Sequence, residues 1–153
     1  MDKDQKSTTK ILQVGVKILT QPVRLSSPCL VEVQVTNKSA QPVLLNKRLS
    51  VGYRDSQSRE LYFEIFGKGS TEDVGKRKLL YERPFASPED YVWVEPEQSV
   101  AANFDLFEWY SLPSIGEYEL VAYYQGDEKL APKPTGLLTG TYCSERIALT
   151  VVP

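Results

Sequence analysis

Acidic residues stand on both sides of a short apolar run, and they are the first candidates for chemistry in this sequence. Glu89 and Asp90 precede the run YVWV at 91–94, and Glu95 and Glu97 follow it. Paired carboxylates can provide the acid and the base of a hydrolase that has no histidine. Acidic turns that contain proline are more typical of solvated hinges, so we expect no catalytic residue here.

The sequence contains no histidine. This removes the usual general base, the usual partner of a serine or cysteine nucleophile, and the commonest transition-metal ligand. Glu72 and Asp73 are carboxylates of the kind that calcium prefers, but no loop has the spacing of an EF-hand. We therefore predict a protein that is not an enzyme and that binds no metal or cofactor.

The two cysteines, Cys29 and Cys143, leave two interpretations open. They are too few for a disulfide scaffold and too far apart in the sequence for a zinc knuckle. Each is either a buried free thiol or one half of a single disulfide near the two ends of the fold.

Aromatic rings at the surface are candidates for carbohydrate binding, because they stack on the apolar faces of sugar rings. The candidates are Trp93, Trp109 and Tyr110. Trp109, in the segment FEWYSL, is more typical of a corner that packs against the edge of the fold. Trp93 shares one face of its strand with Tyr91, and one face of that strand must look outward unless another element covers it.

Two loops carry the candidates for contact with a protein partner. Leu137 and Leu138 lie between glycines in the loop at 125–142, and apolar loop tips on a rigid frame can act as anchors. Lys76, Arg77 and Lys78 lie in the loop at 67–90 and could contact an acidic partner. Both groups have simpler interpretations, because the leucines can fold back onto the core and the basic run can be a solvated surface.

The composition excludes several classes of partner. With 18 basic and 20 acidic side chains the net charge is −2, so there is no basic excess to attract nucleic acid. No apolar run approaches the roughly 20 residues that cross a bilayer, and residues 1–10 lack the apolar region of a signal peptide. The location stays unknown, and we favour a periplasmic or secreted protein whose signal peptide is missing from this sequence.

Apolar residues that recur at every second position predict β-strands along most of the chain. We expect a flexible tail at 1–10, then a single domain at 11–153 that is long enough to bury a sizeable core. The segment at 107–115 is typical of a short helical turn. Strands are predicted at 11–19, 29–37, 43–45, 61–66, 91–94, 99–106, 116–124 and 146–152.

Seven to nine short strands without an amphipathic helix favour an all-β fold, an antiparallel β-sandwich. A small closed barrel would show the same alternation and is the alternative architecture. Tyr118, in IGEYEL, follows a glycine turn at the start of a strand. Such a tyrosine can donate its hydroxyl to upstream backbone, as in a tyrosine corner, or it can be an ordinary buried strand aromatic.

Three segments in order, VTNKSAQPVLL, VEPEQSVAANFDLFEWYSLPSIGEYELVAYY and LLTGTYCSERIALTVV, resemble an immunoglobulin-like β-sandwich module. The likeness is to the amino-terminal domain of deuterolysin-type (aspzincin) metallopeptidases and to freestanding uncharacterised bacterial proteins, and it covers residues 11–152. It implies an accessory or binding domain that is usually exported. The sequence departs from that pattern in its last loop, where Leu138 precedes the TG turn and Glu145 follows Ser144.

We therefore predict a non-enzymatic binding or accessory module that contacts another protein through its end loops, at 67–90 and 125–142. A protease inhibitor is one specific version, in which an end loop enters an active-site cleft. The alternatives are a carbohydrate-binding module that uses exposed aromatic rings and a structural subunit of an envelope assembly.

Overall fold

The computed structural model describes residues 11–56, 59–78, 86–126 and 140–153. This part of the chain is all-β, as the alternation predicted, and its helical segments are two short 3-10 turns. Residues 1–10, which we predicted to be a flexible tail, lie outside the described residues. The strands are β2 (Leu12–Ile18), β3 (Val23–Arg24), β4 (Leu30–Asn37), β5 (Val43–Asn46), β6 (Leu61–Gly67), β7 (Lys76–Arg77), β8 (Tyr91–Val94), β9 (Ser99–Asp105), β10 (Tyr110–Ser111), β11 (Gly116–Gln125), β12 (Thr141–Cys143) and β13 (Ile147–Val152), and the 3-10 turns are η2 (Pro88–Asp90) and η3 (Leu106–Glu108).

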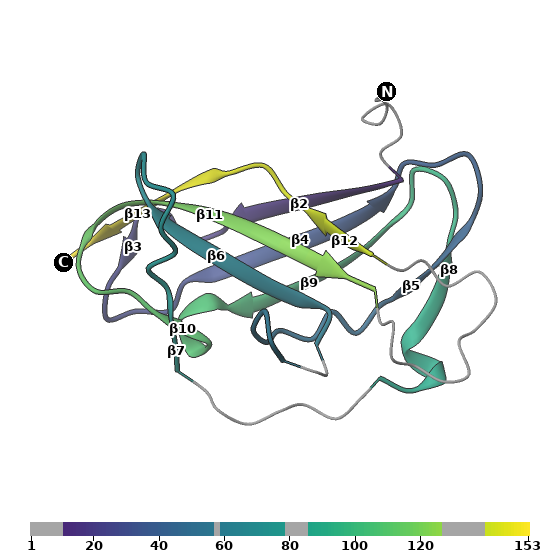
Figure 1. Cartoon of the computed structure of the whole chain (residues 1–153), viewed down its shortest axis with the longest axis horizontal. Helices are drawn as coiled ribbons and strands as arrows, with labels where there is room; N and C mark the ends of the chain where they lie inside the picture. The colour runs from purple at the N-terminus through teal and green to yellow at the C-terminus, as the bar shows by residue number, and fades with distance from the viewer. Residues whose placement is uncertain (1–10, 57–58, 79–85, 127–139) are drawn as a thin grey trace.

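Two larger sheets contain most of the strands (Figure 1). One is the antiparallel sheet β2-β4-β9. In the other, β11 pairs with β6 along one edge and with β12 and β13 along the opposite edge, while β3 adds to β13 in parallel. Two small ladders, β5–β8 and β7–β10, lie at opposite ends of the molecule, and the β7–β10 ladder is at the end that carries the carboxyl terminus (Figure 1).

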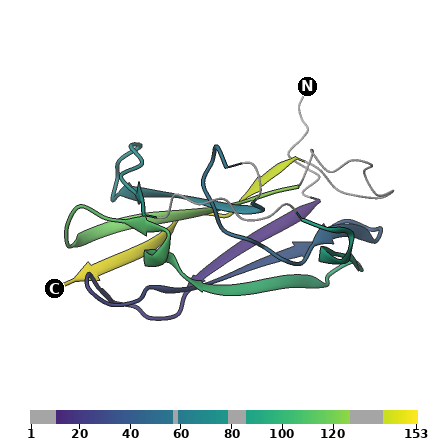
Figure 2. The ribbon, with the colours of Figure 1, turned by 90° about the horizontal axis from the view of Figure 1, so that it is seen from below.

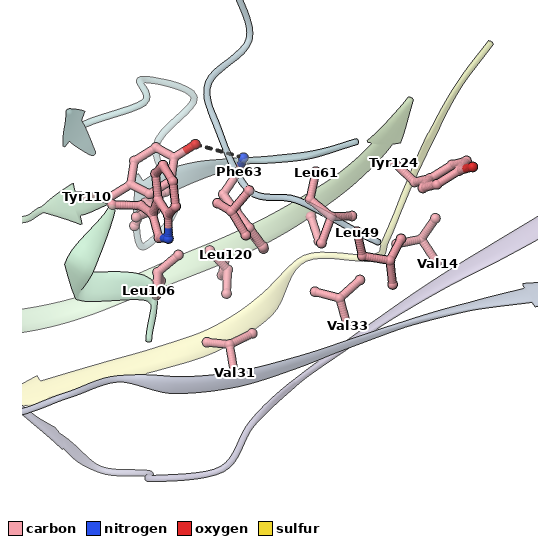
Figure 3. Packing of buried hydrophobic residues seen from close by; sticks show 14 of the residues in the cluster. Val14, Val31, Val33, Leu49, Leu61, Phe63, Leu106, Tyr110, Leu120 and Tyr124 are labelled. Carbon is pink, nitrogen blue, oxygen red and sulfur yellow. Dashed lines mark hydrogen bonds between the residues drawn. The ribbon is translucent and has the colours of Figure 1, made fainter. Parts of the chain in front are cut away.

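The hydrophobic core lies between the two larger sheets, which Figure 2 shows as separate layers. In β4 the side chains of Val31, Val33 and Val35 are fully buried, while their neighbours along the strand are more exposed. From the other sheet, Leu120 and Phe63 lie opposite Val31 and Val33 across the core (Figure 3). Fully burying one such aliphatic or aromatic side chain stabilises a fold by about 1.5–3 kcal/mol. Each sheet therefore buries its apolar face against the other sheet, which gives the two layers.

The predicted strands are confirmed in position, whereas the number of strands is larger than predicted. Eight of the described strands have four or more residues, within the predicted range, and Tyr91–Val94 has the predicted bounds. The helical turn after β9 is also present, as η3. Four shorter strands, β3, β7, β10 and β12, were not predicted, because two or three residues are too few to show a period of two.

The described strands do not form the closed barrel that was the alternative. No ladder of hydrogen bonds joins β2-β4-β9 to the sheet around β11 in the described part of the chain. The helices found there, with three residues each, are far too short to span a membrane.

Tyr118 forms the predicted contact with upstream backbone. Its hydroxyl donates to the carbonyl of Ser114 at 2.7 Å, and its ring is only 6% exposed. Gly116, between them, has a φ of 148°, a conformation that side chains rarely adopt. The tyrosine therefore ties the turn before β11 to the edge of the core.

Candidate functional site

The structure does not bring the predicted binding residues together. Lys76 and Arg77 form β7, and Lys78 follows it, at the end of the molecule that carries the carboxyl terminus (Figure 1). Trp93 lies on β8, at the opposite end (Figure 1). Leu137 and Leu138 lie outside the described residues. The basic cluster and Trp93 are therefore separate candidates.

The three basic side chains of the cluster differ in their partners. Arg77 forms an ion pair with Asp55, and its guanidinium lies 4.7 Å from the centre of the Tyr53 ring. The ammonium groups of Lys76 and Lys78 have neither an ion pair nor a hydrogen bond within the described residues. Lys78 is held by its backbone, whose N–H donates to the carbonyl of Trp109 at 3.0 Å. The two lysines are thus the groups left to attract an acidic ligand.

Lys78 lines a pocket of about 160 Å³ whose wall is partly apolar and partly polar. We call this pocket the lysine pocket. Its wall brings together residues that are distant in the sequence, from the turn after β3, from η3 and from the segment after it. Its lining residues are Leu25, Lys78, Phe107, Tyr110, Ser111 and Leu112.

Hydrogen bonds hold the wall of the lysine pocket in place. The carboxylate of Asp105 accepts from the backbone N–H of Phe107 at 3.0 Å, which caps η3, and from that of Cys29 at 2.8 Å. The hydroxyl of Tyr110 points into the core, where it accepts from the N–H of Phe63 (Figure 3) and donates to the carbonyl of Gly52 at 2.9 Å. The ring of Tyr110 therefore contributes only apolar surface to the pocket.

The lysine pocket combines apolar side chains with the positive charge of Lys78 in its lining. Leu25 is 40% exposed, so the pocket opens at the surface. An apolar wall lowers the local dielectric constant and strengthens the attraction between an ammonium group and a carboxylate. The arrangement therefore suits a ligand that carries an apolar group next to a negative charge.

The structure separates the three aromatic candidates for carbohydrate binding. Trp93 is 56% exposed and pairs with Leu44 across the β5–β8 ladder. Trp109 and Tyr110 are both buried, and the ring of Trp109 packs against that of Tyr53 with centroids 6.1 Å apart. The packing interpretation of Trp109 is confirmed, and Trp93 remains an exposed ring.

Several candidate carboxylates have structural partners. Asp90 accepts a hydrogen bond from the backbone N–H of Ser87 at 2.8 Å and caps η2. Glu97 forms an ion pair with Lys38 at 2.8 Å. Asp73, considered for calcium, accepts from two backbone N–H groups at 3.0 and 3.1 Å. Among the described residues, no group of three or more histidine, cysteine or acidic side chains is arranged to hold a metal ion.

The prediction for the cysteines, two buried thiols or one disulfide, is wrong for Cys143. Cys29 is fully buried, but Cys143 is exposed, and both are free thiols. Cys143 lies in β12, opposite Tyr123, on the outer face of the sheet. A three-residue strand carries too little alternation to show in the sequence which way its side chains point. The structure does not contain the disulfide, because both thiols are free, one buried and the other exposed.

Cysteine labelling is expected to distinguish the two thiols. Burial, with a smaller effect of the Asp105 carboxylate, raises the pKa of Cys29 from its ordinary value of 9.0 to about 12. At pH 8 Ellman's reagent should therefore modify one thiol in the native protein and two in the denatured protein. Mass spectrometry should place the native label on Cys143. A native label on Cys29 would contradict the buried position of that residue.

The same shift predicts a loss of stability in alkali. Because the folded pKa lies above the unfolded one, the neutral Cys29 stabilises the fold fully below pH 9, and this contribution disappears as the pH rises to about 12.

A buried ion pair was missed in the sequence. Glu60 is 1% exposed and accepts two hydrogen bonds from the guanidinium of Arg48, at 3.0 and 2.7 Å. It also accepts from the backbone N–H of Ser50 at 2.7 Å. Charged residues beside strands are common at protein surfaces, so no local pattern distinguished this pair. It joins the segment after β5 to the start of β6.

An aromatic cluster on the outer face of the sheet was also missed. The rings of Tyr62 and Tyr123 stack with centroids 4.7 Å apart, and the guanidinium of Arg54 lies 5.0 and 5.6 Å from them. Glu64 forms an ion pair with Arg54 and accepts a hydrogen bond from the hydroxyl of Tyr123. Burial and this carboxylate raise the pKa of Tyr123. The charged groups of Arg54 and Glu64 satisfy one another, which is typical of a structural cluster.

No protein family matches this chain, and no curated protein matches its sequence. The function must therefore be inferred from the geometry of the chain itself.

Proposed function

We propose that this chain is a non-enzymatic, protein-binding module whose lysine pocket binds an acidic segment of a partner protein. The observation that carries the proposal is the ammonium of Lys78, which has no partner in the described residues and lines a partly apolar pocket of about 160 Å³. Lys76, two residues before Lys78 and in β7, adds a second positive charge. The proposal builds on the sequence prediction that the basic run at 76–78 could contact an acidic partner.

The order of the strands supports a fold of the immunoglobulin type. In that fold, strands A, B and E form one sheet and strands C, F and G the other. Here β2-β4-β9 correspond to the first set and β6-β11-β13 to the second. The bond from the Tyr118 hydroxyl to the Ser114 carbonyl, at the start of β11, matches a tyrosine corner at the start of strand F. Such a frame holds its end loops rigidly, as a binding module requires.

The chemistry of the pocket defines the bound segment. An apolar side chain of the partner would fill the space between Leu25, Phe107 and Leu112, with a gain of about 1.5–3 kcal/mol for one fully buried leucine. A neighbouring carboxylate would pair with Lys78. Charge pairing at the rim of an interface mainly sets specificity and association rate, whereas the buried apolar group supplies most of the affinity.

The minimal test uses N-acetyl-L-leucine and its neutral carboxamide as probes. In ¹H–¹⁵N NMR titrations, the acid should shift the backbone signals of residues that line the lysine pocket, and the carboxamide should bind up to about fivefold more weakly, as the loss of an exposed ion pair of at most about 1 kcal/mol would give. The variant Lys78→Met should reduce the affinity for the acid to that for the carboxamide. Lys17→Met, which removes an exposed lysine of β2, is the matched control.

Equal binding of acid and carboxamide would overturn the role of Lys78. Signal changes that cluster around Trp93 instead of Phe107 would overturn the assignment of the site.

A further inference from the structure

A second cavity, also lined by a residue of η3, supports an inference beyond protein binding. It has a volume of about 200 Å³ and lies between β9 and the segment 48–51 that follows β5. We propose that this cavity, the β9 cavity, binds one small neutral ligand rich in hydroxyl groups, such as a single sugar ring. Its lining includes Arg48, Ser50, Asn103, Phe104, Glu108 and Trp109.

The first observation is an unsatisfied hydroxyl. Ser50 lines the β9 cavity and is 4% exposed, yet its Oγ has no hydrogen-bond partner within the described residues. Buried polar atoms nearly always have a partner, because leaving one without a partner is destabilising. A ligand hydroxyl in the cavity would satisfy this atom, since a hydroxyl group both donates and accepts.

The second observation is the backbone conformation of Leu49, the residue before Ser50. Leu49 has a φ of 47°, in the left-handed region that residues other than glycine rarely adopt. Its side chain is 2% exposed and lies in the core near Leu61 (Figure 3). This conformation lets the residues on both sides of Leu49 reach Glu60, Arg48 with its guanidinium and Ser50 with its N–H. Strained backbone of this kind is concentrated at binding sites, where the surroundings hold it in place.

The charges of the β9 cavity favour a neutral ligand. The guanidinium of Arg48 is already paired with Glu60, at 2.7 Å, so it leaves little positive charge for an anion. The carboxylate of Glu108 would repel an anion as well. A cation would find only the exposed carboxylate of Glu108, since the carboxylate of Glu60 is already paired with Arg48. A polyol avoids both problems, because Glu108 can accept from one hydroxyl and the amide of Asn103 can donate to or accept from another.

The size and the rings of the cavity define the ligand further. At about 200 Å³ the cavity is smaller than the 300–1,000 Å³ of sites for drug-sized ligands, so it suits a single ring. Phe104, which is half-buried, supplies aromatic surface on which the C–H groups of a sugar can lie. Trp109 is buried and only forms part of the cavity wall behind it.

Saturation-transfer NMR with four monosaccharides tests this proposal. The probes are D-glucose, D-galactose, D-mannose and N-acetyl-D-glucosamine, and at least one should bind with a dissociation constant of the order of 1 mM, as expected for so small a ligand. Asn103→Ala, at an exposed position that the fold tolerates, should weaken binding about tenfold. Trp93→Ala and Lys78→Met should leave it unchanged, which separates this site from the exposed tryptophan and from the lysine pocket.

The variant Ser50→Ala distinguishes a ligand-binding role of the Ser50 hydroxyl from a purely structural role. If the hydroxyl is kept for a ligand, its removal should weaken sugar binding at least tenfold and leave the melting temperature unchanged or higher, since an unsatisfied buried group has been removed. A lower melting temperature for Ser50→Ala would overturn the proposal. So would the absence of transfer to all four sugars, or loss of binding in Trp93→Ala with retention in Asn103→Ala.

Discussion

Replacing Glu60 by alanine is expected to lower the free energy of unfolding by about 3–5 kcal/mol. The carboxylate accepts three hydrogen bonds, two from Arg48 and one from the N–H of Ser50, and its side chain is only 2% exposed. The alanine variant leaves a largely buried guanidinium without its counter-charge and a buried N–H without an acceptor. Both losses are costly because water cannot replace the missing carboxylate. Urea denaturation followed by tryptophan fluorescence measures the change.

Glu117→Ala is the matched control for this variant. Glu117 also forms an ion pair, with Lys68 at 3.2 Å, but its side chain is 59% exposed. Exposed pairs contribute between zero and about 1 kcal/mol, so this change should be several times smaller than that of Glu60→Ala. Equal losses in the two variants would contradict the buried position of Glu60. The double variant Arg48→Met/Glu60→Leu should recover part of the stability, because it removes both buried charges together.

Leu120→Ala is the second change with a large expected effect. Leu120 lies in the middle of β11, is fully buried, and faces the valines of β4 across the core (Figure 3). Its truncation removes apolar contact and leaves a cavity between the two larger sheets, which should lower the free energy of unfolding by about 2–5 kcal/mol. The same urea titration measures it.

Leu30→Ala provides the comparison, because it makes the same chemical change in the opposite sheet. Leu30 is 41% exposed on the outer face of β4. Surface substitutions of this kind usually change stability by about 0.5 kcal/mol or less. A large loss for Leu30→Ala with a small one for Leu120→Ala would mean that the inner and outer faces of the strands had been exchanged.

Much of the fold was predictable because it depends on local patterns. The alternation around Val33 identified both the position of β4 and the face that it buries, and Leu149 in β13 shows the same. The contact of Tyr118 with upstream backbone followed from a glycine turn just before a strand. These features need only a few neighbouring residues, so a short stretch of sequence carries the whole signal.

The candidate sites were predictable only in part. The basic run at 76–78 was recognised as a binding candidate, but its apolar neighbours were not. Lys78 contacts the lysine pocket because β7 pairs with β10, a ladder of two residues on each strand. Ladders this short arise from the packing around them and leave no period in the sequence. The sequence also gives no sign of the unsatisfied hydroxyl of Ser50, because it depends on the backbone conformation of Leu49.

By itself, the sequence determined the all-β class and the inward faces of the longer strands. Side chains alternate between the two faces of a strand with a period of two residues, and apolar residues with that period must bury one face. Only the tertiary structure decided which residues meet at the lysine pocket and the β9 cavity, and that Cys143 is exposed while Cys29 is not. Those neighbours depend on sheet order and register, which are set by packing between segments far apart in the chain.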